Sequence, residues 1–485
     1  MNTSYDVIII GGGVVGSAIA RELSRYQLHI AVLEKNLDVC FETSGRNSAV
    51  LHGGFAYDPG TFKARFCVEG NAEFDQVAQE LDVPFKRTGK VLVGNTPEDM
   101  ERLKTTLETG NINGARQLSI IDEAKLHELV PAVIGKFALW SPTSGIMDPF
   151  LYTVALAENA AHNGAEYHFD AEVTGIRRAG DVYHLDTKQG EFTAKWVVNS
   201  AGLGCGKISE MLGLTGFKVI GSKGDYIILD KKVGPLLPMP VYPVPTNTYM
   251  GIHVTPTVDG NVTIGPNAEQ VSLDPAEAYY GVPQRNMDFL ADSVSNLWPC
   301  VRREDQIRNY SGILPKWVDE NGVIQDWKIE LDDRAPNTVN LVGIESPALT
   351  AALPIARYVV SLIDSKMALT KKADFDPIRK GIRRFATATD EERAALIAAD
   401  PNYGELICRC EEVTKAELLQ AIHNPLGCHT MVSVKLRTRA MMGRCQGGYC
   451  QMRLAEFIRQ ETGCEPEDIL YNRTGSYVFT GRVRT

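Results

Sequence analysis

Four cysteines near the C-terminus are the side chains of this sequence best suited to chemistry. Cys408 and Cys410 stand in the string ICRCEEVT, and Cys445 and Cys450 stand in GRCQGGYC. The spacing is therefore C-x-C, a gap of 34 residues, and C-x4-C. Four cysteine thiolates hold a [2Fe–2S] cluster, and two close pairs from separated segments can supply two ligands to each iron. This spacing predicts an electron-carrying cluster, and hence a redox protein.

Zinc and a disulfide are the alternatives for these four thiols. Structural zinc usually takes pairs spaced C-x2-4-C, since the chain must turn around one ion, and the tight C-x-C pair fits that geometry poorly. A disulfide needs an oxidising compartment, of which the sequence carries no sign. The other six cysteines show no paired spacing and are predicted to be buried thiols in a reducing cytoplasm: Cys40, Cys67, Cys205, Cys300, Cys428 and Cys464.

Length and charge limit the classes of protein that remain. A chain of 485 residues is too long for one hydrophobic core, so two or three domains are expected. The net charge of -10 and the lack of any Lys/Arg run argue against a nucleic-acid surface. The first apolar run is too short for a signal peptide and ends in glycine. No stretch approaches the ~18 apolar residues of a membrane span. We therefore expect a cytoplasmic protein without a transmembrane segment.

The N-terminus carries a second pattern with chemical meaning. A β-branched apolar run over residues 5–10 ends in GGGVVG and continues into SAIARELSRY, the order strand, glycine turn, helix. Gly11 permits the tight turn, Gly13 lets the backbone approach a pyrophosphate, and Gly16 lets helix and strand pack closely. Glu34 follows a second apolar strand about 20 residues later, where a carboxylate holds the ribose of a dinucleotide. A free 2′-hydroxyl suits this acid, so FAD or NAD is favoured over NADP.

Residues 42–74 decide between these two cofactors. The segment is dense in Ser, Asn, Arg, His and Gly, and so long a polar segment suits a flavin that must be wrapped between domains. Its GRNS, LHGG and PGTFKARFCVEGN strings resemble the D-amino-acid-oxidase-like FAD oxidoreductases, and within them the L-2-hydroxyglutarate oxidases. The strings WVVNSAGLG (196–204) and LVGIESPALTAALPIA (341–356) are similar to the second FAD strand and the closing flavin loop of that family. The resemblance spans residues 5 to about 365.

The resemblance implies an α/β fold, in which a Rossmann-type FAD-binding domain carries an antiparallel-sheet substrate domain. Short strands over 219–268 would form the sheet that roofs the flavin. FAD-binding parts are expected at about 1–80, 150–215 and 335–365, and substrate parts at about 81–149 and 216–334, within one unit of residues 1–365. The FAD contacts carried over from the family are Gly11, Gly13, Val14, Val15, Gly16, Glu34, Lys35, Ser44, Arg46, Asn47, Ser48, Val173 (at the adenine), Ala201, Gly202, Gly343, Ile344, Leu349 and Thr350.

The C-terminal part resembles a different family. Residues 366–404 are charged and broken by prolines, so a linker with a surface helix is expected there. Residues 405–485 resemble the bacterioferritin-associated-ferredoxin-type [2Fe–2S] domain, a small and mainly helical module in which a helix is capped near Thr414. Helix N-termini and glycine amides would stabilise the negative charge of the cluster, and Arg409 and Arg444 either add to this or are ordinary surface residues. The same pairing of FAD and cluster occurs in anaerobic glycerol-3-phosphate dehydrogenase catalytic subunits.

The two resemblances together imply oxidation of a small anionic secondary alcohol. L-2-hydroxyglutarate and glycerol 3-phosphate are the examples, with hydride transfer to FAD as the reaction. The base should be an imidazole near the flavin, and His52 and His253 are the candidates. A structural role is expected for the histidines of residues 151–186, which are His162, His168 and His184.

An anionic substrate also needs fixed cations. The candidates are Lys63, Arg65, Arg308 and Lys316. In many relatives the segment that corresponds to SGILPK (311–316) carries an arginine where this chain has Leu314. Without this arginine, Lys316 could replace it only as a point charge, because lysine lacks the bidentate fork of arginine. The identity of the substrate is therefore not decided by the sequence.

The expected function is a dehydrogenase that passes electrons from FAD through the [2Fe–2S] cluster to another protein subunit. Two alternatives remain: an oxidase that uses O2 and has a structural cluster, and a docking subunit without turnover. Intact FAD motifs and the two candidate histidines argue against the docking subunit. The GRCQGGYC loop is expected to contact the partner, with Tyr449 and Met452 either at that interface or packed inside the module.

Overall fold

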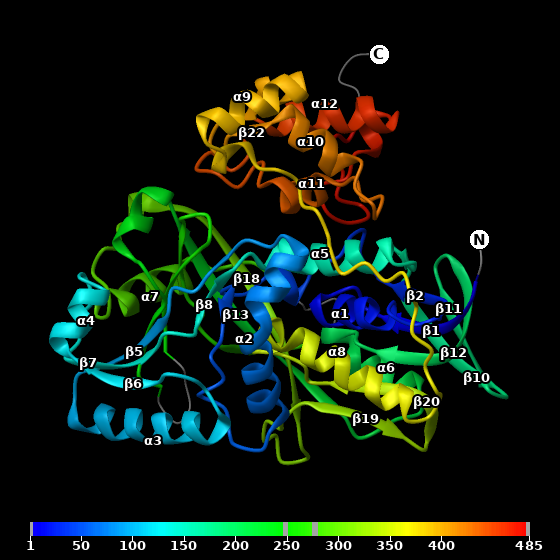
Figure 1. Cartoon of the computed structure of the whole chain (residues 1–485), viewed down its shortest axis with the longest axis horizontal. Helices are drawn as coiled ribbons and strands as arrows, with labels where there is room; N and C mark the ends of the chain where they lie inside the picture. Colours follow the sequence, from blue (N-terminus) through cyan, green and yellow to red (C-terminus); the bar gives the residue numbers. More distant parts are fainter. Residues whose placement is uncertain (1–2, 246–250, 274–279, 482–485) are drawn as a thin grey trace.

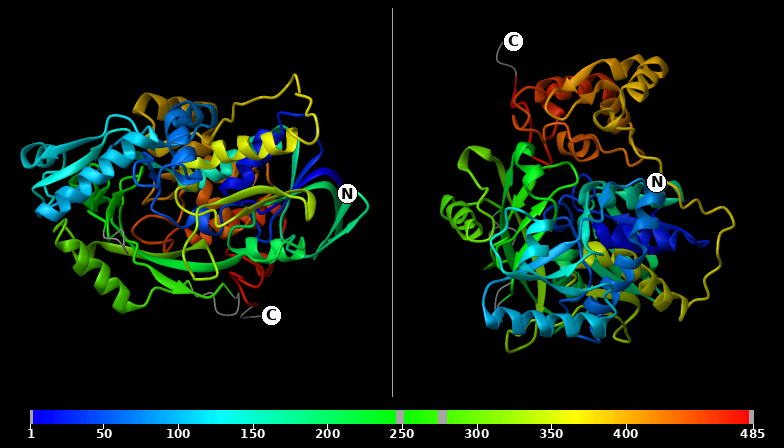
Figure 2. Two further views of the ribbon diagram at one scale, coloured as in Figure 1. Left: turned by 90° about the horizontal axis from the view of Figure 1, so that it is seen from below. Right: turned by 60° about the vertical axis from the view of Figure 1, so that its left-hand side comes forward.

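The computed structural model describes residues 3–245, 251–273 and 280–481. A body built on two large sheets extends as far as helix α8 (Ala348–Asp364), and a small C-terminal module lies against one side of it (Figure 1). An extended segment after α8 runs along the outside of the body before it reaches the module (Figure 2). No helix in the described ranges is both long enough and apolar enough to cross a membrane.

The first sheet has the dinucleotide-binding arrangement. Strand β1 (Ser4–Ile10) lies inside the strand order β10-β11-β12-β1-β2-β9 and pairs in parallel with β2 (Ile30–Leu33) and β12 (Gly190–Asn199). Helix α1 (Val14–Leu23) packs against α5 (Pro149–His162) and α8, so β1 and β2 are buried. The other elements are β9 (Ala165–His168), β10 (Val173–Ala179), β11 (Val182–Thr187), β19 (Lys328–Asp332), β20 (Ala335–Val342) and α6 (Cys205–Met211).

The second sheet has the strand order β17-β13-β16-β15-β14-β5-β7-β6, with β18 on β13. It is mainly antiparallel, as predicted for residues 219–268, but β14 (Val241–Pro243) runs parallel to β5 (Lys90–Gly94). Residues 246–250 of that predicted segment lie outside the described residues. The other strands are β6 (Ser119–Asp122), β7 (Phe137–Ser141), β13 (Lys218–Leu229), β15 (Val254–Pro256), β16 (Val262–Ile264), β17 (Glu269–Val271) and β18 (Gln306–Val318).

Helices and a small third sheet complete the body. Helix α2 (Phe62–Leu81), which contains the last part of the polar segment 42–74, packs against α8, the last helix of the body. The third sheet, in the order β3-β8-β4, consists of β3 (Val50–Leu51), β4 (Phe85–Lys86) and β8 (Gly145–Met147). The helices beside the second sheet are α3 (Pro97–Asn113), α4 (Glu123–Leu129) and α7 (Gln284–Ser295).

The C-terminal module is mainly helical, as predicted. Helix α10 (Lys415–Ile422) begins at Thr414, whose side chain and backbone exchange hydrogen bonds with Glu417, and this capping box confirms the predicted cap. Helix α9 (Asp390–Ala399) has no buried residue and is the surface helix expected before the module. The remaining elements of the module are α11 (Met431–Thr438), α12 (Gln451–Thr462), β21 (Leu406–Cys408) and β22 (Val413–Thr414).

Buried ion pairs join the module to the body. Arg437 of α11 donates to both carboxylate oxygens of Asp38, at 2.5 and 3.2 Å, and to Glu158 of α5 at 3.3 Å. Arg439 lies 2.7 Å from Asp259. These five side chains are at most 9% exposed. These pairs join the module to the body through charges that stay paired only in this docked arrangement.

The prediction that the six remaining cysteines are buried is correct for four of them. Cys40, Cys67, Cys205 and Cys428 are buried, whereas Cys300 and Cys464 are half-buried. The exceptions have a local reason. Cys300 lies in irregular chain between α7 and β18, and Cys464 is the second residue after the end of α12. Both side chains pack against the edge of a hydrophobic core and are covered only in part.

Candidate active site and cluster site

The three glycines of the turn between β1 and α1 have different surroundings. Gly11 has a φ of +105°, a conformation that favours glycine. A Cβ on Gly16 would lie 1.9 Å from the Gly11 carbonyl oxygen, so only glycine lets α1 pack on β1. A Cβ on Gly13 would meet only the Ser44 hydroxyl oxygen, at 3.1 Å. The Gly13 backbone therefore faces open space at the N-terminus of α1, where free N–H groups favour a pyrophosphate.

Glu34 stands directly after β2 and its carboxylate turns back towards the glycines. Oε2 accepts the N–H of Gly12 at 2.7 Å, and Oε1 accepts the N–H of Asn36 at 2.8 Å. Burial raises the pKa of Glu34. The neighbouring Lys35 is half exposed and lies 3.6 Å from Glu42. A buried acid beside an open glycine turn is the arrangement that the ribose and pyrophosphate of FAD require.

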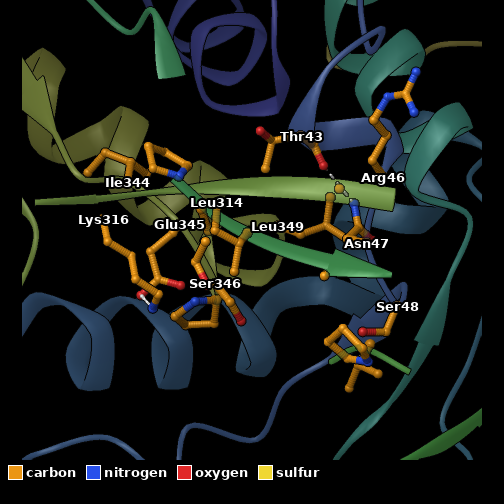
Figure 3. Close-up of a pocket in the computed structure, with 18 of the residues that line it drawn as sticks. Thr43, Arg46, Asn47, Ser48, Leu314, Lys316, Ile344, Glu345, Ser346 and Leu349 are labelled. Carbon is orange, nitrogen blue, oxygen red and sulfur yellow. Dashed lines mark hydrogen bonds and ion pairs between the residues drawn. The ribbon is translucent and has the colours of Figure 1, made fainter. Parts of the chain in front are cut away.

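A cavity of about 620 Å³ lies where the loops of the first sheet meet the second sheet. Figure 3 shows Asn47 and Ser48 on one side of this space and Ile344, Glu345 and Lys316 on the other. Ten predicted FAD contacts line its wall: Gly13, Val14, Val15, Ser44, Arg46, Asn47, Ser48, Gly202, Ile344 and Leu349. The wall does not include Gly11, Gly16, Glu34, Lys35, Val173, Ala201, Gly343 and Thr350. The ten wall residues and the open glycine turn fit FAD, and the contacts of the other eight residues stay predictions.

Both candidate histidines line this cavity. Among the described residues, neither ring nitrogen of His52 has a hydrogen-bond partner, and its backbone N–H donates to the Thr350 hydroxyl at 3.0 Å. His253 is 4% exposed, and its Nδ1 lies 3.2 Å from the Thr255 hydroxyl. Burial, with a smaller effect of the charge on Lys90, lowers the pKa of His52 to about 3 and that of His253 well below its usual value. Both rings are therefore neutral at pH 7.

The three histidines of residues 151–186, for which a structural role was expected, do not line the cavity. His162 at the end of α5 lies 3.5 Å from Asp376. His168 of β9 lies 2.9 Å from the Tyr5 hydroxyl, and His184 of β11 lies 3.0 Å from a Glu191 oxygen. Each ring contacts a polar neighbour on the surface side of the first sheet or its helices, so none of them adds to the candidate active site.

The predicted substrate cations differ in their position relative to the cavity. Lys63 and Lys316 share one carboxylate, since Glu345 lies 2.6 Å from the first and 3.6 Å from the second. Lys316, Glu345 and Leu314 line the cavity. Arg65 is exposed and pairs with Glu69 on its own helix.

Arg308 is a correction to the predicted site. It stands eight residues before Lys316 on β18, and at ~3.4 Å per residue the two positions are roughly 27 Å apart along the strand. Its side chain donates to Gln446 of the cluster module at 2.9 Å and does not line the active-site cavity. The spacing along one long strand therefore removes Arg308 from the substrate site.

Lys90 is a cavity residue that the sequence did not single out. It is the first residue of β5, is 3% exposed, and lines the cavity together with both candidate histidines. Its Nζ lies 3.5 Å from the centre of the Tyr242 ring and 5.4 Å from that of Phe55. Burial lowers its pKa to about 7. The sequence offers one signal for a buried lysine here, its place at the start of the apolar run KVLVG. A strand that begins in solvent shows the same pattern, so the signal does not identify a cavity residue.

The four module cysteines come together in two pairs. Cys408 is hydrogen-bonded to Cys450, and Cys410 to Cys445, so each pair joins the CxC segment to the GRCQGGYC segment. Within the described ranges, no three His, Cys, Asp or Glu side chains are arranged to hold a single metal ion. Two thiol pairs from two segments are the donor set that a [2Fe–2S] cluster requires, and the residues fit this group.

Backbone N–H groups surround the sulfurs. The N–H of Met441 donates to the Cys408 and Cys450 sulfurs, and those of Gly447 and Tyr449 donate to Cys445. Such donors stabilise thiolate charge, as expected for this loop. The backbone of residues 441–447 turns tightly to bring these N–H groups to the sulfurs, and Met441 has a φ of +67° in this turn.

The surface around the cluster site is partly apolar. Cys445 is exposed, as are Tyr449 (45%) and Met452 (58%), so the last two side chains do not pack inside the module. Arg409 lies 4.5 Å over the Tyr449 ring. Arg444 is 74% exposed and lies 3.6 Å from Asp230 of the body, which makes it a surface and docking residue.

A second cavity of about 240 Å³ lies between the body and the module. Residues 46–49 line both cavities and therefore separate them. The module contributes Met442 and Gln446, which flank the ligand Cys445 in sequence, and the body contributes Arg308. The short segment 46–49 thus lies between the first cavity, which holds the predicted FAD contacts, and this second cavity beside the cluster loop.

Similar proteins agree with both sites. The family model described as FAD dependent oxidoreductase matches residues 6–362, and that described as BFD-like [2Fe-2S] binding domain matches residues 406–460. The chain is 36% identical to a glycerol 3-phosphate dehydrogenase of Caloramator mitchellensis over 484 residues, which cover 99% of each chain. It is 30% identical to the L-2-hydroxyglutarate dehydrogenase of Escherichia coli K12 over 406 residues, 75% of this chain and 94% of that one.

Solved structures show the same fold for the body. The L-alpha-glycerophosphate oxidase of Mycoplasma pneumoniae with FAD bound has a TM-score of 0.73 and 26% identity, over 78% of this chain and 98% of that one. Glycine oxidase of Geobacillus kaustophilus shares the fold with a TM-score of 0.67 at 22% identity, over 78% and 100% of the two chains. The chain belongs to the FAD-dependent oxidoreductase family and carries a BFD-like [2Fe–2S] binding domain at its C-terminal side.

Proposed function

We propose that the chain is a dehydrogenase that oxidises a small anionic secondary alcohol, with glycerol 3-phosphate as the first candidate. The proposal rests on the cavity in which predicted FAD contacts meet two neutral imidazoles. The similarity to a glycerol 3-phosphate dehydrogenase supports this substrate, because it covers the whole chain with the cluster domain included. When bound, FAD accepts the hydride of the alcohol carbon, and the [2Fe–2S] cluster carries electrons one at a time.

His52 is the proposed base. Its ring lines the cavity without a hydrogen-bond partner among the described residues, so it is free to accept the proton of the substrate hydroxyl. His253 has one ring nitrogen engaged by Thr255, which fixes the ring and leaves its other nitrogen to orient the substrate. A neutral imidazole accepts a proton, and burial keeps both rings neutral at pH 7.

Electron transfer to the module is supported by the shared segment 46–49. This segment touches the flavin cavity on one side and the interdomain cavity on the other, where Gln446 lies beside the ligand Cys445. Arg308 ties the two parts together by its hydrogen bond to Gln446. The module therefore has a defined position on the body, which electron transfer over a fixed distance requires.

An electron-accepting protein subunit is part of the proposal. The ligand Cys445 is exposed, and beside it lie two exposed residues of types enriched at interfaces, Tyr449 and Met452. A cluster under such a patch is accessible to a second protein. We place the enzyme in the cytoplasm, because a reducing compartment keeps cysteines available as cluster ligands.

The test is an anaerobic reduction experiment on protein loaded with FAD and cluster. We expect glycerol 3-phosphate to bleach the flavin absorption in wild-type protein, and His52→Asn to slow bleaching by about 10²-fold or more. His162→Asn is the matched control, since His162 is exposed and pairs only with Asp376, and it should leave the rate unchanged. A protein that no alcohol bleaches would be a docking subunit, and this outcome contradicts the proposal.

L-2-hydroxyglutarate is the second candidate substrate. The 30% identity to an L-2-hydroxyglutarate dehydrogenase favours it for the body, although that relative matches only 75% of this chain. The same bleaching experiment compares the two alcohols directly. The substrate is the one with the higher rate of flavin reduction at limiting concentration.

A further inference from the structure

We propose that Lys90 binds the anionic group of the substrate. The inference rests on the proposed function, because it names the residue that would hold the charge of that substrate. The ligand class is a small organic phosphate or carboxylate whose oxidised hydroxyl lies near the charged group. Lys90 would then bind the substrate anion in place of the arginine that many relatives carry at the position of Leu314.

The sheet fixes Lys90 relative to the imidazoles. Strand β5 pairs with β14, and β14 pairs with β15, which begins directly after His253. Lys90 Nζ lies 3.5 Å from the centre of the Tyr242 ring, and the His253 ring stacks on Tyr242 at 3.8 Å with planes 9° apart. Two groups this close cannot share one face of a ring, so Tyr242 lies between Lys90 and His253. The cation and the imidazole therefore keep a constant separation.

The other cations of the cavity wall already have partners. Lys316 lies 3.6 Å from Glu345, which also binds Lys63 at 2.6 Å. Arg46 donates to two backbone carbonyl groups and lies 4.4 Å over an aromatic ring. No Asp or Glu oxygen in the described part of the chain forms an ion pair with Lys90. Of the two lysines that line the cavity, Lys90 is thus the one without an ion pair among the described residues, and the Arg46 guanidinium already donates to backbone carbonyl groups.

The surroundings of Lys90 supply no negative charge at neutral pH. His52 and His253 are neutral because burial lowers their pKa values. Burial raises the pKa values of the Cys67 thiol and the Tyr242 hydroxyl, so both keep their protons. An unpaired buried ammonium is unfavourable, and its own pKa falls to about 7. A bound anion would supply the missing charge, so anion binding and protonation of Lys90 are coupled.

The test measures anion binding without turnover. FAD-loaded protein is titrated with malonate and, separately, with inorganic phosphate, and the change in flavin absorption gives each Kd. Lys90→Met should weaken binding by about tenfold to hundredfold, the range for a hydrogen bond to a charged group. Lys104→Met is the matched control, because Lys104 is an exposed lysine of α3 that pairs with Glu101 away from the cavity wall, and it should change Kd by less than about threefold.

A pH series gives a second readout that does not depend on a variant. Malonate is essentially a dianion from pH 7 to 9, so its own charge is constant there, and its Kd should rise about tenfold per pH unit over this range as Lys90 loses its proton. Lys90→Arg should abolish this rise, because arginine stays charged. If Lys90→Met does not retain FAD, the pH dependence of the malonate Kd in wild-type protein still tests the role of Lys90.

Two results would overturn the inference. One is a malonate Kd that is the same in Lys90→Met and wild type. The other is a flat pH profile in wild-type protein. Failure of the proposed function looks different: malonate would bind with the Lys90 dependence described, while no alcohol would bleach the flavin.

Discussion

Arg437→Met tests whether one buried guanidinium holds the cluster module on the body. Methionine keeps much of the side-chain length but leaves Asp38 buried at 0% exposure without its cation. Breaking one partner out of a buried pair costs about 3–5 kcal/mol. Glu158 retains Arg379 at 2.7 Å, so only one carboxylate is orphaned and the lower end, ~3 kcal/mol, applies. The docked state should weaken by about 10²-fold.

Hydrogen exchange is the appropriate assay, because it reports local opening without assuming two-state unfolding of a multidomain chain. Amides of α11, which faces the body, should exchange about a hundredfold faster in Arg437→Met than in wild type. Arg453→Met is the control: Arg453 pairs with Glu405 within the module, both side chains are more than a third exposed, and the change should stay below about 1 kcal/mol.

The reasoning also predicts a rescue. Asp38→Asn in the Arg437→Met background removes the orphaned charge, so the double variant should be less destabilised than Arg437→Met alone. Equal exchange rates in Arg437→Met and Arg453→Met would refute the role of this ion pair. A double variant that opens more easily than the single one would refute the desolvation argument.

Three further predictions concern the cofactors and the acceptor. Cys408→Ser and Cys445→Ser should each abolish cluster absorption and iron content while FAD stays bound, and protein that contains zinc and no iron would contradict the electron-transfer role. Gly13→Val should fold but lose FAD, measured by the flavin released on denaturation, whereas Gly16→Val should also lower stability because its Cβ meets a carbonyl oxygen. Substrate-reduced protein should reoxidise slowly in air and quickly with a one-electron dye, and rapid peroxide formation that persists in Cys450→Ser would contradict a protein acceptor.

Features that depend on a few consecutive residues could be predicted from the sequence. The glycine spacing around Gly13 specifies a strand, a turn and a helix, because Gly11 takes a positive φ at the turn and Gly16 packs directly on the Gly11 carbonyl within the same motif. The helix start at Thr414 depends on a residue three positions later. The cysteine spacing predicted that the four thiols serve one cluster, while the pairing of Cys408 with Cys450 and of Cys410 with Cys445 came only from the structure.

Only the tertiary structure decided which side chains meet in the cavity. Lys90 contacts Tyr242, on which His253 stacks, because β5 pairs with β14 and β14 with β15, and no local pattern specifies such long-range pairing. Arg308 and Lys316 look equivalent in sequence, yet one strand carries them to different cavities because an extended chain spans ~3.4 Å per residue. Sequence thus determined the local cofactor motifs of this protein, and strand pairing across the second sheet determined which charged side chains line the cavity.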